Sequence, residues 1–265
     1  MSDGPHLFPF GVLGAGDPSP AGTERRSLSQ ILLVADHAGN AVPSGLPLGV
    51  GEADLGRHIG IDIGALGVAR AMSAALGAEL IYQRYSRLVI DCNRPPSEPS
   101  ALPERVDGTD IPGNTAMTSR DVAGRVAEIF HPYHAAIAAG LDRRRDAGIE
   151  PVLIAVHSFT PVHGDYPTPR PWPVAVLYDK DPSLSLALAD VLGEDGTLVG
   201  RNEPYQVGAL GDYTIPVHGE ERGILHTLIE VRQDGIGDAA GETRWGERLA
   251  AALQTALSRL ERTTW

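Results

Sequence analysis

Short apolar runs alternate along this chain with longer stretches in which apolar residues recur at helical spacing. The apolar runs predict buried strands at 31–35, 79–83, 87–91, 152–156, 174–178 and 225–231. The helical spacings predict helices over 54–76, from Thr118 to about 147, over 183–192, and around the stripe of Leu249, Leu253, Leu257 and Leu260. Strands that alternate with helices predict an α/β protein with a largely parallel or mixed sheet covered on both faces.

Local signals place the ends and interruptions of these elements. Gly77 suits the end of the first helix, and Thr118 with Asp121 predicts a capping box at the start of the second. Pro132 predicts a kink or a split in that second helix. The proline-rich stretch 95–114 predicts a long ordered loop near the functional site.

The two ends of the chain differ in organisation. Residues 1–29 are rich in Gly, Pro and Ser and lack periodicity, which predicts a loosely attached N-terminal arm. Residues 30–265 contain no internal repeat and no clear break in composition. We therefore expect them to form a single catalytic α/β domain.

Composition excludes several classes of function. The chain carries 34 acidic and 22 basic residues and a net charge of −12, which argues against a nucleic-acid partner. It has no apolar run of 18 residues and no basic head followed by an apolar stretch, so we expect no membrane span and a cytoplasmic location. Lys180 is its single lysine, which nearly excludes Schiff-base chemistry and a phosphate-loop lysine.

Two histidines stand at the ends of predicted strands and suggest a metal site. His37 and His157 each follow an apolar run, and two imidazoles at adjacent strand ends can bind one ion with a third ligand from a carboxylate or an amide. Asn40 and Asp62 are the candidates for that third ligand, and Asp36 is a candidate acceptor that orients a histidine. The alternative is that each histidine only caps its strand with a hydrogen bond.

Three other side chains have less specific signals. His131 and His134 have i,i+3 spacing and could form a second metal pair, although a solvated helix face is the favoured interpretation. Cys92 is interpreted as a small buried filler beside a strand rather than as a nucleophile.

Charged residues at and within the predicted strands suggest a catalytic site. Arg87 enters the predicted strand 87–91, and Arg94, which follows it into the proline-rich loop, is suited to hold a substrate carboxylate. Glu230 lies within an apolar strand, where desolvation would raise its pKa and make it a usable general base. The alternatives are a surface ion pair for Arg94 and an ion pair with Arg232 for Glu230.

Together these motifs resemble the N-formylglutamate amidohydrolase family, from about residue 30 to residue 240. The resemblance rests on the segments 35–40, 86–96, 157–159 and 228–232 and on Asp62. The segment 91–94, Asp-Cys-Asn-Arg, is also similar to that of aspartoacylases and succinylglutamate desuccinylases, within the wider zinc-carboxypeptidase-like group.

The resemblance implies a fold and a metal. The fold is a three-layer α/β/α arrangement of the phosphorylase/hydrolase-like type with a central mixed, largely parallel sheet, and the cofactor is one zinc ion or another divalent metal. His37 and His157 would be metal ligands. The third ligand stays open between Asp62 and Asn40, because the wider group has His-x-x-Glu where this chain has His37-x-x-Asn40.

The resemblance also implies a reaction. Glu230 would activate a water molecule as general base, and Arg87 would stabilise the oxyanion. Asn93, Arg94 and Arg232 would bind the substrate. The expected substrate is a small anionic N-acyl amino acid such as N-formyl-L-glutamate. The alternatives are a zinc deacylase or peptidase for another acyl group, and a non-catalytic binder of small carboxylates.

Overall fold

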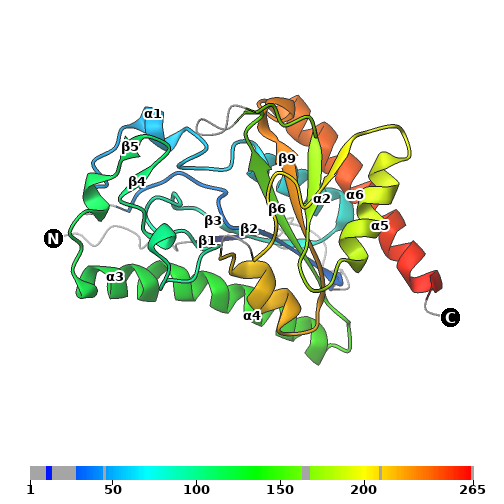
Figure 1. Cartoon of the computed structure of the whole chain (residues 1–265). Coiled ribbons are helices and arrows are strands. Elements are labelled where there is room, and N and C mark those ends of the chain that lie inside the picture. The colour runs from blue at the N-terminus through cyan, green and yellow to red at the C-terminus, as the bar shows by residue number, and fades with distance from the viewer. Residues whose placement is uncertain (1–9, 14–27, 44–45, 163–167, 209–210, 264–265) are drawn as a thin grey trace, which may run out of the picture.

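A mixed seven-stranded sheet forms the centre of the protein (Figure 1). The computed structural model describes residues 10–13, 28–43, 46–162, 168–208 and 211–263. The sheet has the order β1-β3-β2-β6-β9-β7-β8. Its strands are β1 (Phe10–Leu13), β2 (Ile31–Ala35), β3 (Glu79–Gln83), β6 (Val152–Phe159), β7 (Val174–Leu177), β8 (Val199–Arg201) and β9 (Leu225–Arg232). β1 is antiparallel to β3 and β7 to β9, whereas the other neighbours are parallel. The predicted mixed, largely parallel sheet is therefore confirmed.

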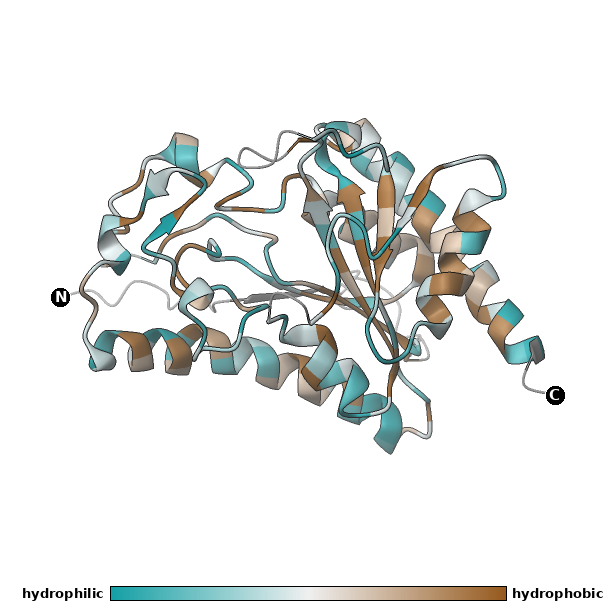
Figure 2. Ribbon diagram, in the orientation of Figure 1, coloured by the Kyte–Doolittle hydropathy of each residue, from teal (hydrophilic) through white to brown (hydrophobic). Residues whose placement is uncertain are grey.

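Helices cover both faces of the sheet and complete the three layers (Figure 1). One layer contains α2 (Ala65–Leu76), α5 (Ser183–Gly193) and α6 (Ala239–Thr263), and the other contains α3 (Ser119–Arg125) and α4 (His131–Asp146). Figure 2 shows the central strands mainly in the colours of hydrophobic residues, while the connecting segments are more hydrophilic.

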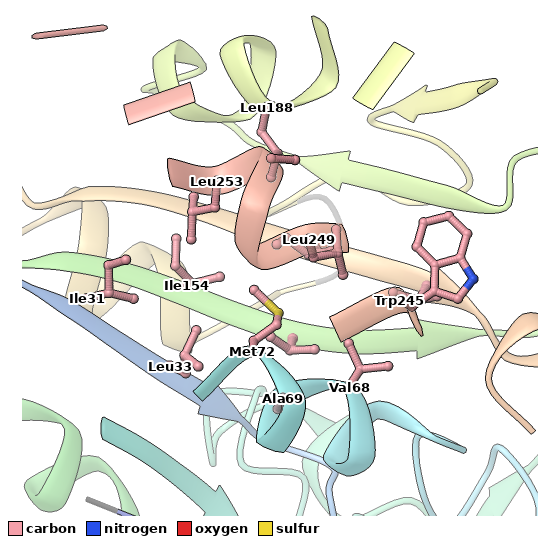
Figure 3. Packing of buried hydrophobic residues seen from close by; sticks show 14 of the residues in the cluster. Ile31, Leu33, Val68, Ala69, Met72, Ile154, Leu188, Trp245, Leu249 and Leu253 are labelled. Carbon is pink, nitrogen blue, oxygen red and sulfur yellow. The ribbon is translucent and has the colours of Figure 1, made fainter. Parts of the chain in front are cut away.

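The side chains of β2 divide between two hydrophobic cores. Leu33 packs in one core with Met72 of α2 and Leu249 of α6 (Figure 3), whereas Leu32 belongs to the other core together with Ile137 of α4. A strand that is buried on both faces needs apolar side chains at every position. This is why the inner strands appear in the sequence as continuous apolar runs rather than as alternating patterns.

The second predicted helix is present, and it is divided into three segments. The capping box is confirmed, because Thr118 Oγ1 accepts from the Asp121 N–H and Asp121 Oδ2 accepts from the Thr118 N–H. α3 is followed by a π-helical turn, Val126–Phe130, and then by α4. The interruption predicted at Pro132 is therefore the π-helical turn Val126–Phe130, which lies just before that proline. Pro132 has no backbone N–H to continue the regular α-helical hydrogen bonding there.

The strand predicted at 87–91 was wrong, because this segment forms a turn. The Val89 N–H donates to the Ser86 carbonyl, and the Asp91 N–H donates to the carbonyl of Ala101 rather than to a neighbouring strand. Leu88 and Ile90 are fully buried, so the apolar pattern arose from the burial of a turn.

The helix predicted over 54–76 is also interrupted. α1 (Glu52–Leu55) ends early, and α2 begins only at Ala65 and ends before Gly77, as predicted. Gly64 precedes α2 with a φ of 76°, and a Cβ there would lie 2.2 Å from the Ile236 carbonyl oxygen. The break between the helices places Asp62 in an irregular segment, where its N–H donates to the His37 carbonyl.

The two segments expected to be irregular contain some local structure. Phe10–Leu13, within the predicted arm, is the edge strand β1, while residues 1–9 and 14–27 of that arm lie outside the described residues. The stretch 95–114 is a loop with short elements: 3₁₀ turns at Pro99–Ala101 and Pro112–Asn114 and the two-residue strands β4 (Arg105–Val106) and β5 (Thr109–Asp110). Among the described helices, none has the length and apolar character needed to cross a membrane.

Candidate metal and catalytic centre

Three parallel strands bring the candidate residues to one edge of the sheet. His37 lies two residues beyond β2, and His157 and Glu230 lie opposite each other in the register of β6 and β9. The carboxyl ends of parallel strands meet at this edge, which is the usual position of binding sites in open α/β sheets. Asp62 reaches the same place from the irregular segment between α1 and α2.

His37, Asp62 and His157 form a buried cluster with the composition of a metal site. Asp62 Oδ2 lies 3.3 Å from His37 Nδ1 and 2.9 Å from His157 Nδ1, and the three donor atoms lie within 4.8 Å of one another. Two imidazole nitrogens and one carboxylate oxygen are a common ligand set for a divalent ion such as Zn²⁺, with a fourth position left for water or substrate. The residues present therefore fit a divalent metal.

The remaining predicted ligand does not join this cluster. Asn40 is exposed at the surface, and it is not among the residues that line the cavity over the cluster. The structure thus brings Asp62, rather than Asn40, to the two imidazoles.

The outer nitrogen of each imidazole faces a second carboxylate. His37 Nε2 lies 2.7 Å from Asp91 Oδ1, and His157 Nε2 lies 3.1 Å from Asp36 Oδ2. With a metal bound, a proton on each Nε2 would satisfy these contacts and leave the lone pair of each Nδ1 for the ion. Without one, a proton on Nδ1 donates to Asp62. This carboxylate–histidine arrangement is the one that orients metal-ligating imidazoles in proteins.

A hydrogen-bond network holds Asp36 in place. Its Oδ1 accepts from Tyr133 Oη at 2.7 Å and from Thr214 Oγ1 at 2.8 Å. Burial alone would raise the pKa of Asp36, but the hydrogen bond with His157 and the other donors lower that pKa to about 2. Tyr133 and Thr214 were not predicted from the sequence, where neither is close to Asp36 or carries a recognisable motif.

The charges of the cluster compensate one another. Burial would lower the pKa of His157, but its hydrogen bonds with Asp36 and Asp62 raise that pKa well above the usual value. Burial would raise the pKa of Asp62, and the two histidines instead hold it far below its usual range. The surroundings therefore favour positive charge between these side chains, as a bound cation would require.

Glu230 has the properties of a proton carrier. Its side chain is buried, and burial raises its pKa to about 7. Its Oε2 atom has no hydrogen-bond partner within the part of the chain that the structure describes. The alternative ion pair with Arg232 is not formed, because Arg232 donates to Asp234 and to the carbonyl of Arg170 instead.

The arginines predicted for catalysis and substrate binding have different positions. Arg87 lines the cavity and donates to Asp91 through Nε and Nη2, at 3.0 and 2.6 Å, and to Asp62 through Nη1 at 3.3 Å. Arg94 also lines the cavity, as does Asn93. Arg232 is not among the lining residues.

The cavity over the cluster has a volume of about 970 Å³. Its walls include His37, His157 and Glu230 on the sheet side and the proline-rich loop, from Pro96 to Asp107, on another side. A cavity of this size accommodates a small organic molecule. The prediction that the proline-rich stretch is an ordered loop near the site is therefore confirmed.

The solvated helix face predicted for His131 and His134 is right for His131 and wrong for His134. His131 is exposed, but His134 is buried, with Nδ1 3.0 Å from His218 Nε2 and Nε2 2.8 Å from the carbonyl oxygen of Cys92. The reason is that Phe130 and Ile137, on the same face of the helix, pack into the core and carry His134 inward. Cys92 is fully buried, and burial raises the pKa of its thiol well above the usual value, as expected of a filler.

Comparisons with known proteins agree with these observations. A scan of protein families matches residues 29–237 to the family described as N-formylglutamate amidohydrolase. The solved structure of the gene product Atu2144 from Agrobacterium tumefaciens is 33% identical, with a TM-score of 0.86, and the match covers 95% of this chain and 96% of that one. N-formylglutamate amidohydrolase from Ralstonia eutropha JMP134 shares the fold at 19% identity, with a TM-score of 0.63 and coverage of 97% and 98%. No curated protein matches the chain.

Proposed function

The chain belongs to the N-formylglutamate amidohydrolase family, and we propose that it hydrolyses the amide bond of an N-acyl amino acid in the cavity over His37, Asp62 and His157. The products are the free acyl carboxylate and the amino acid. The observation that carries this proposal is Glu230, a buried carboxylate with a pKa of about 7 and a free oxygen, which lies beside a cluster suited to a divalent metal.

His37, Asp62 and His157 are the residues that would hold the metal, which we propose to be zinc. When bound there, a zinc ion supplies Lewis-acid polarisation of the acyl carbonyl and lowers the pKa of water. Asp91 and Asp36 orient the two imidazoles through their outer nitrogens.

Glu230 is the proposed general base. With a pKa of about 7, its carboxylate is able to accept a proton from the attacking water and to return it to the leaving nitrogen. Arg87 is the proposed oxyanion partner. Hydrogen bonds to Asp91 and Asp62 occupy its Nε, Nη1 and Nη2 atoms, and each terminal nitrogen retains one further N–H for the tetrahedral oxygen.

The substrate is proposed to bind through its carboxylate near Asn93 and Arg94, with N-formyl-L-glutamate as the reference compound. Both residues line the cavity, as the motif-based prediction requires. Formyl, acetyl and succinyl derivatives of one amino acid, compared side by side, identify the acyl group. The free oxygen of Glu230 favours an enzyme over a non-catalytic binder, because a binder has no use for an unpaired buried carboxylate.

The test is Glu230→Gln in the zinc-loaded protein. We expect kcat for the release of the acyl group to fall on the order of 10²–10⁴-fold, because the amide cannot accept the proton. Bound zinc should stay unchanged, because Glu230 is not part of the ligand cluster. A near-normal rate in the variant, or no hydrolysis of any acyl derivative by the zinc-loaded wild type, would contradict the proposal.

A further inference from the structure

Arg94, the predicted holder of the substrate carboxylate, already has a carboxylate partner. Its Nη1 atom donates to Asp212 Oδ1 at 2.6 Å. Both side chains line the cavity, and they are 14% and 12% exposed, so a ligand in the cavity is able to reach them. The positive charge of Arg94 is therefore offset within the wall of the cavity.

Asn93, the second residue predicted to bind the substrate carboxylate, converges on the same atom. Its Nδ2 donates to Asp212 Oδ1 at 3.2 Å, while its Oδ1 accepts from the N–H groups of Tyr213 and Thr214. The other oxygen of Asp212 accepts from the N–H of Gly208 at 3.1 Å. Asp212 thus stands, relative to Asn93 and Arg94, where a bound carboxylate group would stand.

The other cavity arginines also have carboxylate partners, which are buried for Arg87 and exposed to solvent for Arg105. Arg87 pairs with Asp62 and Asp91, and Arg105 pairs with Asp110. Within the described ranges, no arginine that lines the cavity lacks a carboxylate partner.

The wall made by the proline-rich loop carries the carboxylates of Glu98 and Glu104. Asp107, in the same wall, is already paired with Arg57. A substrate with one carboxylate can use the N–H groups that Arg94 does not give to Asp212, which are pre-organised by that ion pair. Among the described residues, a second carboxylate would find no cavity-lining arginine without a carboxylate partner, and it would face the carboxylates of Glu98 and Glu104, which is costly in a partly desolvated site.

We propose that Asp212 is a specificity-determining residue that makes this cavity select N-acyl amino acids with a single carboxylate and a neutral side chain over those with an acidic side chain. This inference rests on the proposed function, and it sets the substrate class apart from N-formyl-L-glutamate. Asp212 acts in two ways. Its negative charge offsets the positive charge of Arg94, and its Oδ1 accepts the hydrogen bonds of Asn93 Nδ2 and Arg94 Nη1 that a second carboxylate would need.

The test combines two isosteric substrates with two isosteric proteins. Initial rates give kcat/KM for N-formyl-L-glutamine and N-formyl-L-glutamate with the zinc-loaded wild type and with Asp212→Asn. We expect the wild type to favour the glutamine derivative by at least about tenfold. In Asp212→Asn the ratio should fall by about tenfold, mainly through a lower KM for the glutamate derivative, because Arg94 gains an unbalanced charge.

Two further variants separate specificity from structure. Asp212→Glu keeps the carboxylate and should keep the wild-type preference. Asp190→Asn breaks an exposed Asp–Arg pair with Arg201 that does not line the cavity, and it should leave the ratio unchanged.

Three outcomes would overturn the inference. The first is that the wild type favours the glutamate derivative or treats both substrates equally. The second is that Asp212→Asn loses both activities in the same proportion. The third is that Asp190→Asn shifts the ratio as much as Asp212→Asn does. If the wild type hydrolyses neither substrate, the proposed function fails. The inference is then decided by calorimetric binding of glutamine and glutamate to the zinc-loaded protein, with the same preference expected and an equal or reversed preference overturning it.

Discussion

Among the described residues, two pairs of buried histidines contact each other or a shared side chain, and the two pairs have different hydrogen-bond partners. Each ring nitrogen of His37 and His157 faces a carboxylate, from Asp62, Asp91 or Asp36. In the other pair, His134 Nδ1 faces His218 Nε2, and His134 Nε2 faces the carbonyl oxygen of Cys92. His218 Nδ1 has no hydrogen-bond partner among the described residues, and the ring of His134 packs against Phe130 and Tyr213.

This difference decides the charge that each pair can carry. Burial lowers the pKa of His134 to about 4 and that of His218 to about 3, so both are neutral near pH 7. Burial acts in the same direction on His157, but its two aspartate partners raise the pKa well above the usual value. Carboxylates, and not burial or the nearness of two imidazoles, therefore give one pair surroundings suited to a cation and leave the other as a packing contact.

The largest expected effect comes from removing the carboxylate shared by the first pair. Asp62→Asn replaces a charged oxygen ligand with a poor neutral one, so zinc affinity should fall by more than the 10–100-fold that loss of an outer-shell partner costs. His134→Gln, in the second pair, should leave zinc affinity unchanged. Chelator competition on the purified proteins measures both, and equal zinc retention in the two variants would remove the distinction between the pairs.

The position of a residue after a strand was enough to predict the first pair. His37 and His157 were recognised because polar side chains at the ends of parallel strands meet at one edge. Glu230 was recognised as a carboxylate within an apolar strand, and the sheet brings it to the same edge. Asp91 was placed in a strand that does not exist. Its role as the partner of His37 and Arg87 depends on a turn that the apolar residues around it conceal.

The second pair shows a signal that was present and was not used. Phe130, His134, Ile137 and Leu141 recur at helical spacing, which places His134 on the apolar face of α4 rather than on a solvated one. The approach of His218 could not be predicted in the same way. It lies 84 residues further along the chain and reaches His134 only because the π-helical turn Ile215–Glu220 packs there.

A smaller effect is expected from the outer partner of His157. Asp36→Asn keeps the size of the side chain but removes the charge that orients the imidazole, and zinc affinity should fall by about 10–100-fold. Tyr133→Phe should cost less, because Asp36 keeps its contacts with His157 and Thr214.

The control for that experiment lies elsewhere in the core. Ser185→Ala removes a buried hydrogen bond with Thr227 that has no contact with the cluster, and it should change stability without changing zinc affinity. If Ser185→Ala weakens zinc binding as much as Asp36→Asn does, the effect of Asp36 is one of general stability and not of imidazole orientation.

The smallest expected effect concerns the second pair and the pH dependence of stability. In the unfolded chain His218 binds a proton below its ordinary pKa of about 6.5, whereas burial keeps it neutral in the folded protein down to about pH 3. Between these limits unfolding takes up a proton, so the contribution of His218 to the free energy of unfolding falls as the pH falls, by up to about 1.4 kcal/mol per pH unit.

The pKa values of Glu230 and His157 are raised in the folded protein, so their contributions to stability change with pH in the opposite direction. The measured quantity is therefore the difference between metal-free wild type and His218→Gln in urea unfolding from about pH 6.5 to pH 4.5. The wild type should lose stability more steeply than His218→Gln, while His131→Gln, at an exposed position on α4, should follow the wild type. Parallel curves for wild type and His218→Gln would mean that the folded protein admits a proton to this pair, and the contrast with the carboxylate-bound pair would then rest on zinc binding alone.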